Sequence, residues 1–159
     1  MPRVERIAWV LLWTTVVLGL GAIVAVVRQE FGACPDETNV TEQFKEMFLA
    51  LTDIVKWGIG IASGAVGLFG LQLLQVKEGP KYSKAGQLLL VSIVLAMCCS
   101  IYFGLRWCSL VAQAWFLKCP HLVSDPLLQR PFDLHTYFFM GGISLLAVVV
   151  VLMLFPPKS

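Results

Sequence analysis

The sequence predicts an all-α integral membrane protein in which four helices cross the bilayer. The chain has 159 residues, of which 58% are hydrophobic and only 14% are charged, whereas soluble domains carry about 25% charged residues. Four apolar runs of about 20 residues each have the length that a helix needs to cross a hydrocarbon core of roughly 30 Å. These runs cover residues 7–27, 54–76, 85–105 and 137–155. We therefore expect a single four-helix transmembrane domain over residues 1–159.

The charges between the runs predict the orientation. Arg3 and Arg6 precede the first run, three lysines fall in the turn 77–84, and the connector 28–53 is rich in acidic residues. Segments rich in lysine and arginine stay in the cytosol. Both termini and the turn 77–84 are therefore expected in the cytosol. The connectors 28–53 and 106–136 are expected on the outer or luminal side of a plasma membrane or endomembrane.

The first outer connector carries a glycosylation signal and a cysteine. Asn39 begins an Asn-Val-Thr sequon, which predicts glycosylation at Asn39. If the chain after residue 106 is helical, Cys108 and Cys119 lie about 16 Å apart, too far for a disulfide, which needs Cα atoms within about 7 Å. We therefore favour a bridge between Cys34 and Cys119. The alternative is that all cysteines are reduced and act as small apolar side chains.

The second and third helices are expected to be longer than the membrane is thick. Asn39 and Glu42 resemble a helix-capping pair, and apolar residues at helical spacing lead from them into the run 54–76. Helix-compatible sequence also follows the run 85–105 and ends at Pro120. Both helices would project to the outer or luminal side as an extended hairpin. The alternative is that the extensions lie flat on the lipid surface.

Three charged residues fall near the predicted outer boundary of the membrane, namely Asp53, Lys56 and Arg106. A charge at this depth is costly unless it is paired or reaches the interface. We interpret the three as a structural cluster of ion pairs, with an ion or proton site at the outer mouth as the alternative.

Small residues mark one face of the second helix. Gly60 and Gly64 form a GxxxG pair, and Ser63 with Gly67 forms a second pair of the same spacing. Such pairs let two helix backbones approach closely inside a membrane. This face is predicted to pack either against Gly19 and Ala22 of the first helix or against a helix of another chain.

Two histidines lie in the third connector, His121 and His135, close to Cys119, Asp125 and Asp133. Histidine is a common metal ligand, but the spacing fits no zinc or haem pattern, so no metal site and no cofactor are predicted. Three prolines suggest an extended loop over the outer face here. They are Pro120, Pro126 and Pro131.

The function expected from these features is non-enzymatic. No catalytic motif is present, and the net charge of +2 is too small and scattered to suggest nucleic acid. The leading hypothesis is an accessory, scaffold or assembly subunit that binds membrane lipids and, through its glycine-rich helix, another membrane protein or further copies of itself. One alternative is an oligomeric channel or junction-type protein with four spans. The other is a thiol–disulfide oxidoreductase acting at the outer face.

Overall fold

The structure is a computed structural model that describes residues 3–27, 42–74, 83–116 and 126–154. Each of these segments is helical, so the described chain is all-α as predicted. The helices are α1 (Arg3–Val27), α2 (Glu42–Leu74), α3 (Lys84–Phe116) and α4 (Pro126–Leu154).

All four helices are long and apolar enough to cross a membrane. The apolar stretches of the helices are Val4–Val27, Lys45–Leu73, Lys84–Trp115 and Leu128–Val151. Large apolar side chains also cover the outside of the bundle, including Trp13 and Trp57, which are 60% and 74% exposed. An apolar exterior of this extent is expected where lipid rather than water surrounds the helices. The fold is therefore that of a multi-pass membrane protein, in agreement with the sequence.

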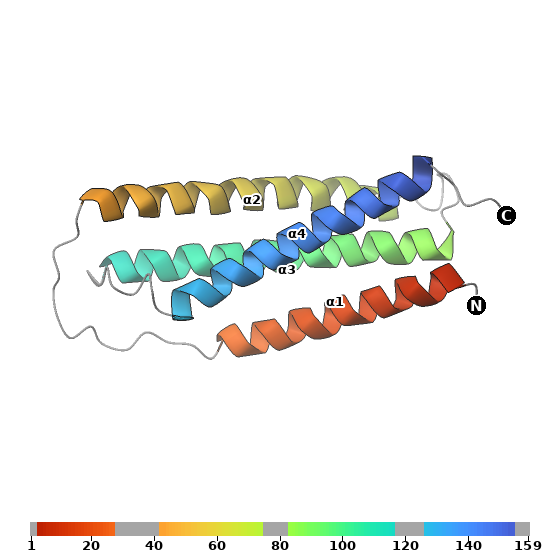
Figure 1. Ribbon diagram of the computed structural model, residues 1–159, viewed down its shortest axis with the longest axis horizontal. Helices are drawn as coiled ribbons and strands as arrows, with labels where there is room; N and C mark the ends of the chain where they lie inside the picture. Colours follow the sequence, from red (N-terminus) through yellow and green to blue (C-terminus); the bar gives the residue numbers. More distant parts are fainter. Residues whose placement is uncertain (1–2, 28–41, 75–82, 117–125, 155–159) are drawn as a thin grey trace.

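Helix α3 lies at the centre of the bundle, with α1, α2 and α4 packed around it (Figure 1). In the most apolar 18-residue stretch of α3, 50% of the residues are buried, whereas in the corresponding stretches of the other three helices 11–17% are buried. In the described chain, α1 and α2 lie on different sides of α3 and hardly meet. The bundle is thus held together mainly through α3.

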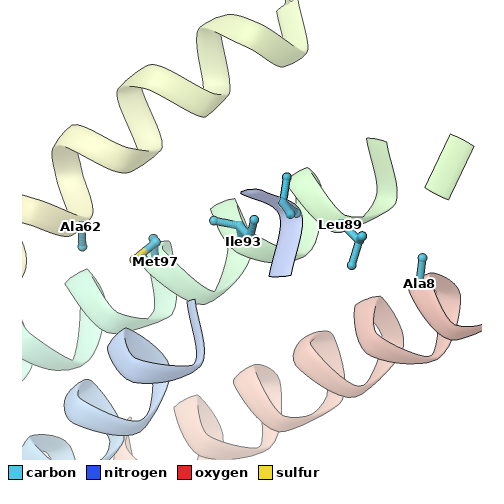
Figure 2. Close-up of a cluster of buried hydrophobic side chains, with 6 residues drawn as sticks. Ala8, Ala62, Leu89, Ile93 and Met97 are labelled. Carbon is cyan, nitrogen blue, oxygen red and sulfur yellow. The ribbon is translucent and has the colours of Figure 1, made fainter. Parts of the chain in front are cut away.

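The first buried cluster joins the helices around the middle and one end of α3 (Figure 2). Leu89, Ile93 and Met97 of α3 pack here with Ala8 of α1 and Ala62 of α2. The two alanines let their helices approach α3 closely, because an alanine side chain adds only a methyl group at the contact.

A second cluster joins α2, α3 and α4 at their other end. Val55, Leu110 and Leu128 come together there around Trp107. The Trp107 ring stacks on Phe48 with ring centroids 6.3 Å apart. Aromatic pairs at such distances add about 0.5–1.5 kcal/mol beyond the area that they bury.

Helices α2 and α3 have 33 residues each, a length of about 50 Å. They were predicted to be longer than a hydrocarbon core of roughly 30 Å, and both are. At the end where α2 begins and α3 finishes, the two helices extend beyond α1 (Figure 1). The second cluster supports this extended end.

The prediction of an extended loop through the prolines is wrong for residues 126–135. Helix α4 begins at Pro126 and contains Pro131. A proline is tolerated in the first turn of a helix, because the amide that it lacks has no partner there. Pro131 lies one turn later, where it removes a backbone hydrogen bond, and it is fully buried.

Candidate interaction site

The glycine-rich face of α2 is open in the described chain. Gly60, Ser63, Gly64 and Gly67 are all exposed. A Cβ atom added at any of these three glycines would meet no described atom within 4 Å. The stripe of small residues therefore lies outside the packed interior.

The predicted packing of this face against α1 is wrong. Gly19 of α1 faces α3 instead, where its Cβ position would lie 2.9 Å from Sγ of Cys99. The physical reason is that α3 lies between α1 and α2. Packing against a helix of another chain remains a prediction.

A different glycine, Gly58, shows which side of α2 faces α4. Gly58 faces α4, and a Cβ atom there would lie 2.7 Å from Nε2 of His135. Successive residues of a helix are separated by about 100°. Gly60 is therefore rotated by about 200° from Gly58, so the open face points away from α4.

His135 forms a buried polar contact between α3 and α4. Only 4% of its surface is exposed. Its Nδ1 lies 2.8 Å from the backbone oxygen of Ser100 and 3.0 Å from Oγ of Ser100. Because a carbonyl oxygen only accepts, Nδ1 carries the proton and donates. The Ser100 hydroxyl in turn donates to the backbone oxygen of His135 at 3.2 Å.

Glycines provide the space for this imidazole. Gly104 of α3 comes close to it, since a Cβ atom there would lie 2.9 Å from Nδ1, and Gly58 comes close from α2. The His135 ring also stacks on Phe139, with centroids 6.2 Å apart. Among the described residues, no three histidine, cysteine or acidic side chains could hold a metal ion together. We therefore interpret His135 as an interhelical clamp.

His135 was expected in a connector, and its contact with Ser100 was missed. A usable signal was present: His135 follows Leu128 by seven residues and precedes Phe139 by four, which is helical spacing. His121, the other histidine of the predicted connector, lies outside the described residues.

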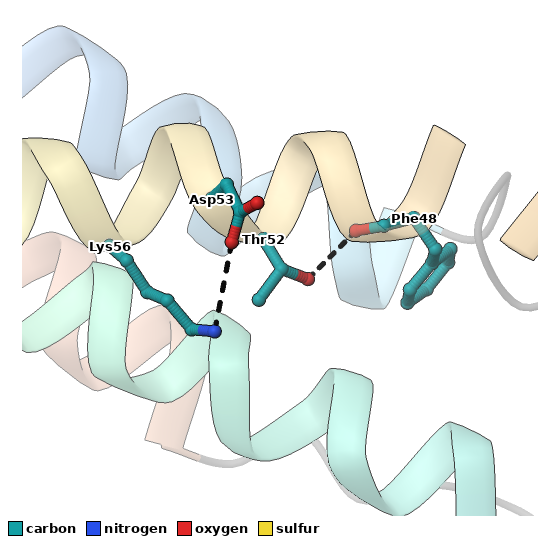
Figure 3. Close-up of polar contacts among 4 residues, drawn as sticks. All are labelled: Phe48, Thr52, Asp53 and Lys56. Atoms are coloured by element: carbon teal, nitrogen blue, oxygen red, sulfur yellow. Dashed lines mark hydrogen bonds and ion pairs between the residues drawn. The ribbon is translucent and has the colours of Figure 1, made fainter. Parts of the chain in front are cut away.

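The predicted charged cluster is found in part (Figure 3). Nζ of Lys56 lies 3.8 Å from Oδ1 of Asp53, and both side chains are about two-thirds exposed, at 66% and 68%. Arg106 lies half-buried on α3. An exposed pair one helical turn apart fits a local ion pair better than a site that holds an ion.

A groove of about 380 Å³ lies between the extended ends of α2 and α3. Its lining is apolar except for Lys45, Thr52 and Lys56 of α2 and the free thiol of Cys108 on α3. Thr52 uses its hydroxyl internally, donating to the backbone oxygen of Phe48 at 2.8 Å (Figure 3). Among the described residues, Lys45 and Lys56 are thus the only charged ones that line the groove.

A larger groove of about 530 Å³ separates α1 from α4. Its lining is apolar apart from Tyr137 and two threonines, Thr14 and Thr15. Both threonine hydroxyls donate to backbone oxygens of their own helix. The groove therefore presents mainly apolar surface, and the hydroxyls of these two threonines are already bonded within α1.

The predicted covalent sites are not covered by the structure. Cys34, Cys119 and Asn39 lie outside the described residues, so the disulfide and the glycosylation stay predictions. The described cysteines are free, with Cys98 exposed and Cys99 half-buried on α3.

The described residues define a class, a helical membrane protein in which they form four helices able to span a membrane, with an open glycine face on α2. Comparison with known protein families, with curated proteins and with solved structures gave no match.

Proposed function

We propose that this protein is a non-enzymatic accessory or assembly subunit that binds a transmembrane helix of another membrane protein through the open face of α2. The observation that carries the proposal is the empty space in front of Gly60, Gly64 and Gly67. Glycine weakens a helix by about 1 kcal/mol relative to alanine. Within this chain, no described contact uses the close approach that these glycines permit.

Close approach is what transmembrane helices use to associate. Lipid tails are as apolar as leucine, so burial from lipid gives little driving force, and van der Waals contact between backbones takes its place. The face of α2 supplies such a contact surface, with Ser63 available for a hydrogen bond across the interface. We propose that the ends of α2 and α3 that extend beyond α1 project to the outer or luminal side, with both termini in the cytosol. There they would give the partner a second point of contact.

The test is co-purification of the tagged full-length protein from its native membrane in mild detergent. We expect a membrane protein to co-purify with the unmodified chain and to be lost from a Gly60→Leu/Gly64→Leu double variant. Because both positions face free space, this variant should fold normally. Ala25→Leu is the matched control, since Ala25 is exposed on α1, and it should keep the partner. A chain that is strictly monomeric, or a partner that survives the double variant, would overturn the proposal.

Self-association into a channel or junction-type oligomer is the main alternative use of the same face. It would give a concentration-dependent increase in particle mass, and conductance in planar bilayers if a pore forms. Thiol–disulfide exchange, the other alternative, would require redox-active cysteines. Counting free thiols with and without reductant tests it, as does a search for bound quinone.

A further inference from the structure

The groove between α2 and α3 and the open glycine face form one continuous surface. On α2, four positions that line the groove are followed by three positions of the glycine face, with the spacing 4, 3, 4, 4, 3, 4. They are Lys45, Leu49, Thr52, Lys56, Gly60, Ser63 and Gly67. At about 100° per residue, all seven fall within a sector of about 80°, and the stripe is about 33 Å long.

This surface lies on the side of α2 away from α4. Lys56 is two residues before Gly58, which contacts His135 of α4, and is therefore rotated by about 200° from it. Figure 3 shows the Lys56 side chain reaching from α2 toward α3, and Lys56 is among the residues that line the groove. A helix lying along this stripe would contact small residues at one end and two cations at the other.

We propose that the α2–α3 groove receives an acidic extension of the partner's transmembrane helix, with carboxylates that pair with Lys45 and Lys56. The inference rests on the proposed function and specifies the chemistry of the partner. Charge complementarity carries it, because Lys45 and Lys56 are the only charged side chains among the described residues that line this otherwise largely apolar groove. Lys56 is able to change partners, since its contact with Asp53 is long and exposed.

The same charges argue against a second copy of this chain as the occupant. In a parallel pair of α2 helices, Lys45 and Lys56 would meet the same two lysines of the other copy, and like charges placed together are unfavourable. A helix that carries two acidic residues eleven positions apart, the separation of Lys45 and Lys56, would meet both cations instead.

The test uses a synthetic peptide as the probe. It is a helix of leucine and alanine with one GxxxG pair, extended by a polar segment with two glutamates eleven residues apart. A control peptide carries glutamine in place of both glutamates. Binding to the full-length protein in uncharged detergent micelles is followed by fluorescence. We expect the glutamate peptide to bind roughly fivefold more tightly than the glutamine peptide, since two partly exposed ion pairs are added.

Cys108 reports where the peptide binds, since this free thiol lines the groove. Its alkylation by N-ethylmaleimide should be slowed several-fold by the glutamate peptide. Alkylation of Cys99, which faces Gly19 of α1, should not change. The Lys45→Gln/Lys56→Gln variant should bind both peptides equally, and Lys45→Glu/Lys56→Glu should prefer a peptide with lysines at the two positions. Both lysines are exposed, so these variants are expected to fold, which circular dichroism checks.

Several results would overturn the inference. One is equal binding of the glutamate and glutamine peptides to the unmodified protein. Another is protection of Cys108 by phosphatidylglycerol alone, which would assign the groove to an acidic lipid. Protection that rises with protein concentration in the absence of peptide would assign it to a second copy. Any of these could occur while Gly60→Leu/Gly64→Leu still releases the native partner, so the proposed function can stand when this inference fails.

Discussion

Helix α2 uses glycine in two different ways on two different faces. On the inner face, Gly58 makes room for the His135 ring, and a single added carbon would come within 2.7 Å of it. On the outer face, Gly60, Gly64 and Gly67 face free space. The glycines on the two faces are alike in chemistry and close in sequence. Their roles are set by the side of the helix on which they lie, a feature of the three-dimensional packing.

The largest loss of stability is expected from a substitution that fills the space at the inner face of α2. Gly58→Leu should lower the free energy of unfolding by about 3 kcal/mol, because the new side chain would overlap His135 and push α2 away from α4. Titration with sodium dodecyl sulfate in detergent micelles, followed by circular dichroism, measures this. The matched control is Gly60→Leu, which should unfold at the same or a higher denaturant fraction. Equal stability of the two variants would show that the inner and outer faces do not differ.

Removing the histidine tests the inner face of α2 from the side of α4. His135→Ala should lower the free energy of unfolding by about 2 kcal/mol, since it removes the hydrogen bonds of the imidazole Nδ1 with Ser100 and leaves a small cavity. Any loss of stability caused by Gly58→Ala should then disappear in the His135→Ala background. The double-mutant cycle should give a coupling energy of about 1 kcal/mol. Additive effects would mean that Gly58 is not there to accommodate the imidazole.

On the outer face, replacing a glycine with alanine should stabilise the isolated protein. Gly64→Ala should raise the free energy of unfolding by about 0.5–1 kcal/mol, because alanine favours the helix and the added methyl group meets nothing. The measurement is again denaturant titration of the purified chain without a partner. A loss of stability would place an atom of this chain against Gly64.

The smallest effect is expected at the exposed ion pair. Asp53→Asn should change the stability by no more than about 0.5 kcal/mol, as is usual for such pairs, and the change should shrink in high salt. Denaturant titration at two salt concentrations measures both effects. A cost above about 1.5 kcal/mol would instead indicate that Asp53 supports the fold.

The number and type of the helices could be predicted from the sequence because lipid imposes a strict length rule. Only a helix satisfies every backbone group within one segment, so an apolar run of about 20 residues has few other structures available. The extension of α2 toward Glu42 followed from amphipathic spacing. The start of α4 was missed because Pro126 and Pro131 were taken as signs of a loop. Pro126 opens the first turn, which accepts proline, and the helix continues through Pro131.

The pairing of the helices could not be derived in the same way. Gly19 of α1 and Gly60 of α2 both permit close approach, and nothing in their spacing says that α3 comes between the two helices. The same is true of the clamp, which joins Ser100 to His135 across 35 positions of sequence. Packing of this kind depends on the whole bundle, whereas sequence periodicity reports on one helix at a time.

The central place of α3 has a consequence for how the chain is made. Synthesis delivers the amino-terminal segments first, so α1 and α2 enter the bilayer before the helix against which each of them packs. Until α3 follows, these two have almost no mutual contact to hold them together. A newly made chain interrupted before Lys84 would therefore contain two apolar helices that do not pack against each other. Insertion of α3 is the step that joins them into a bundle.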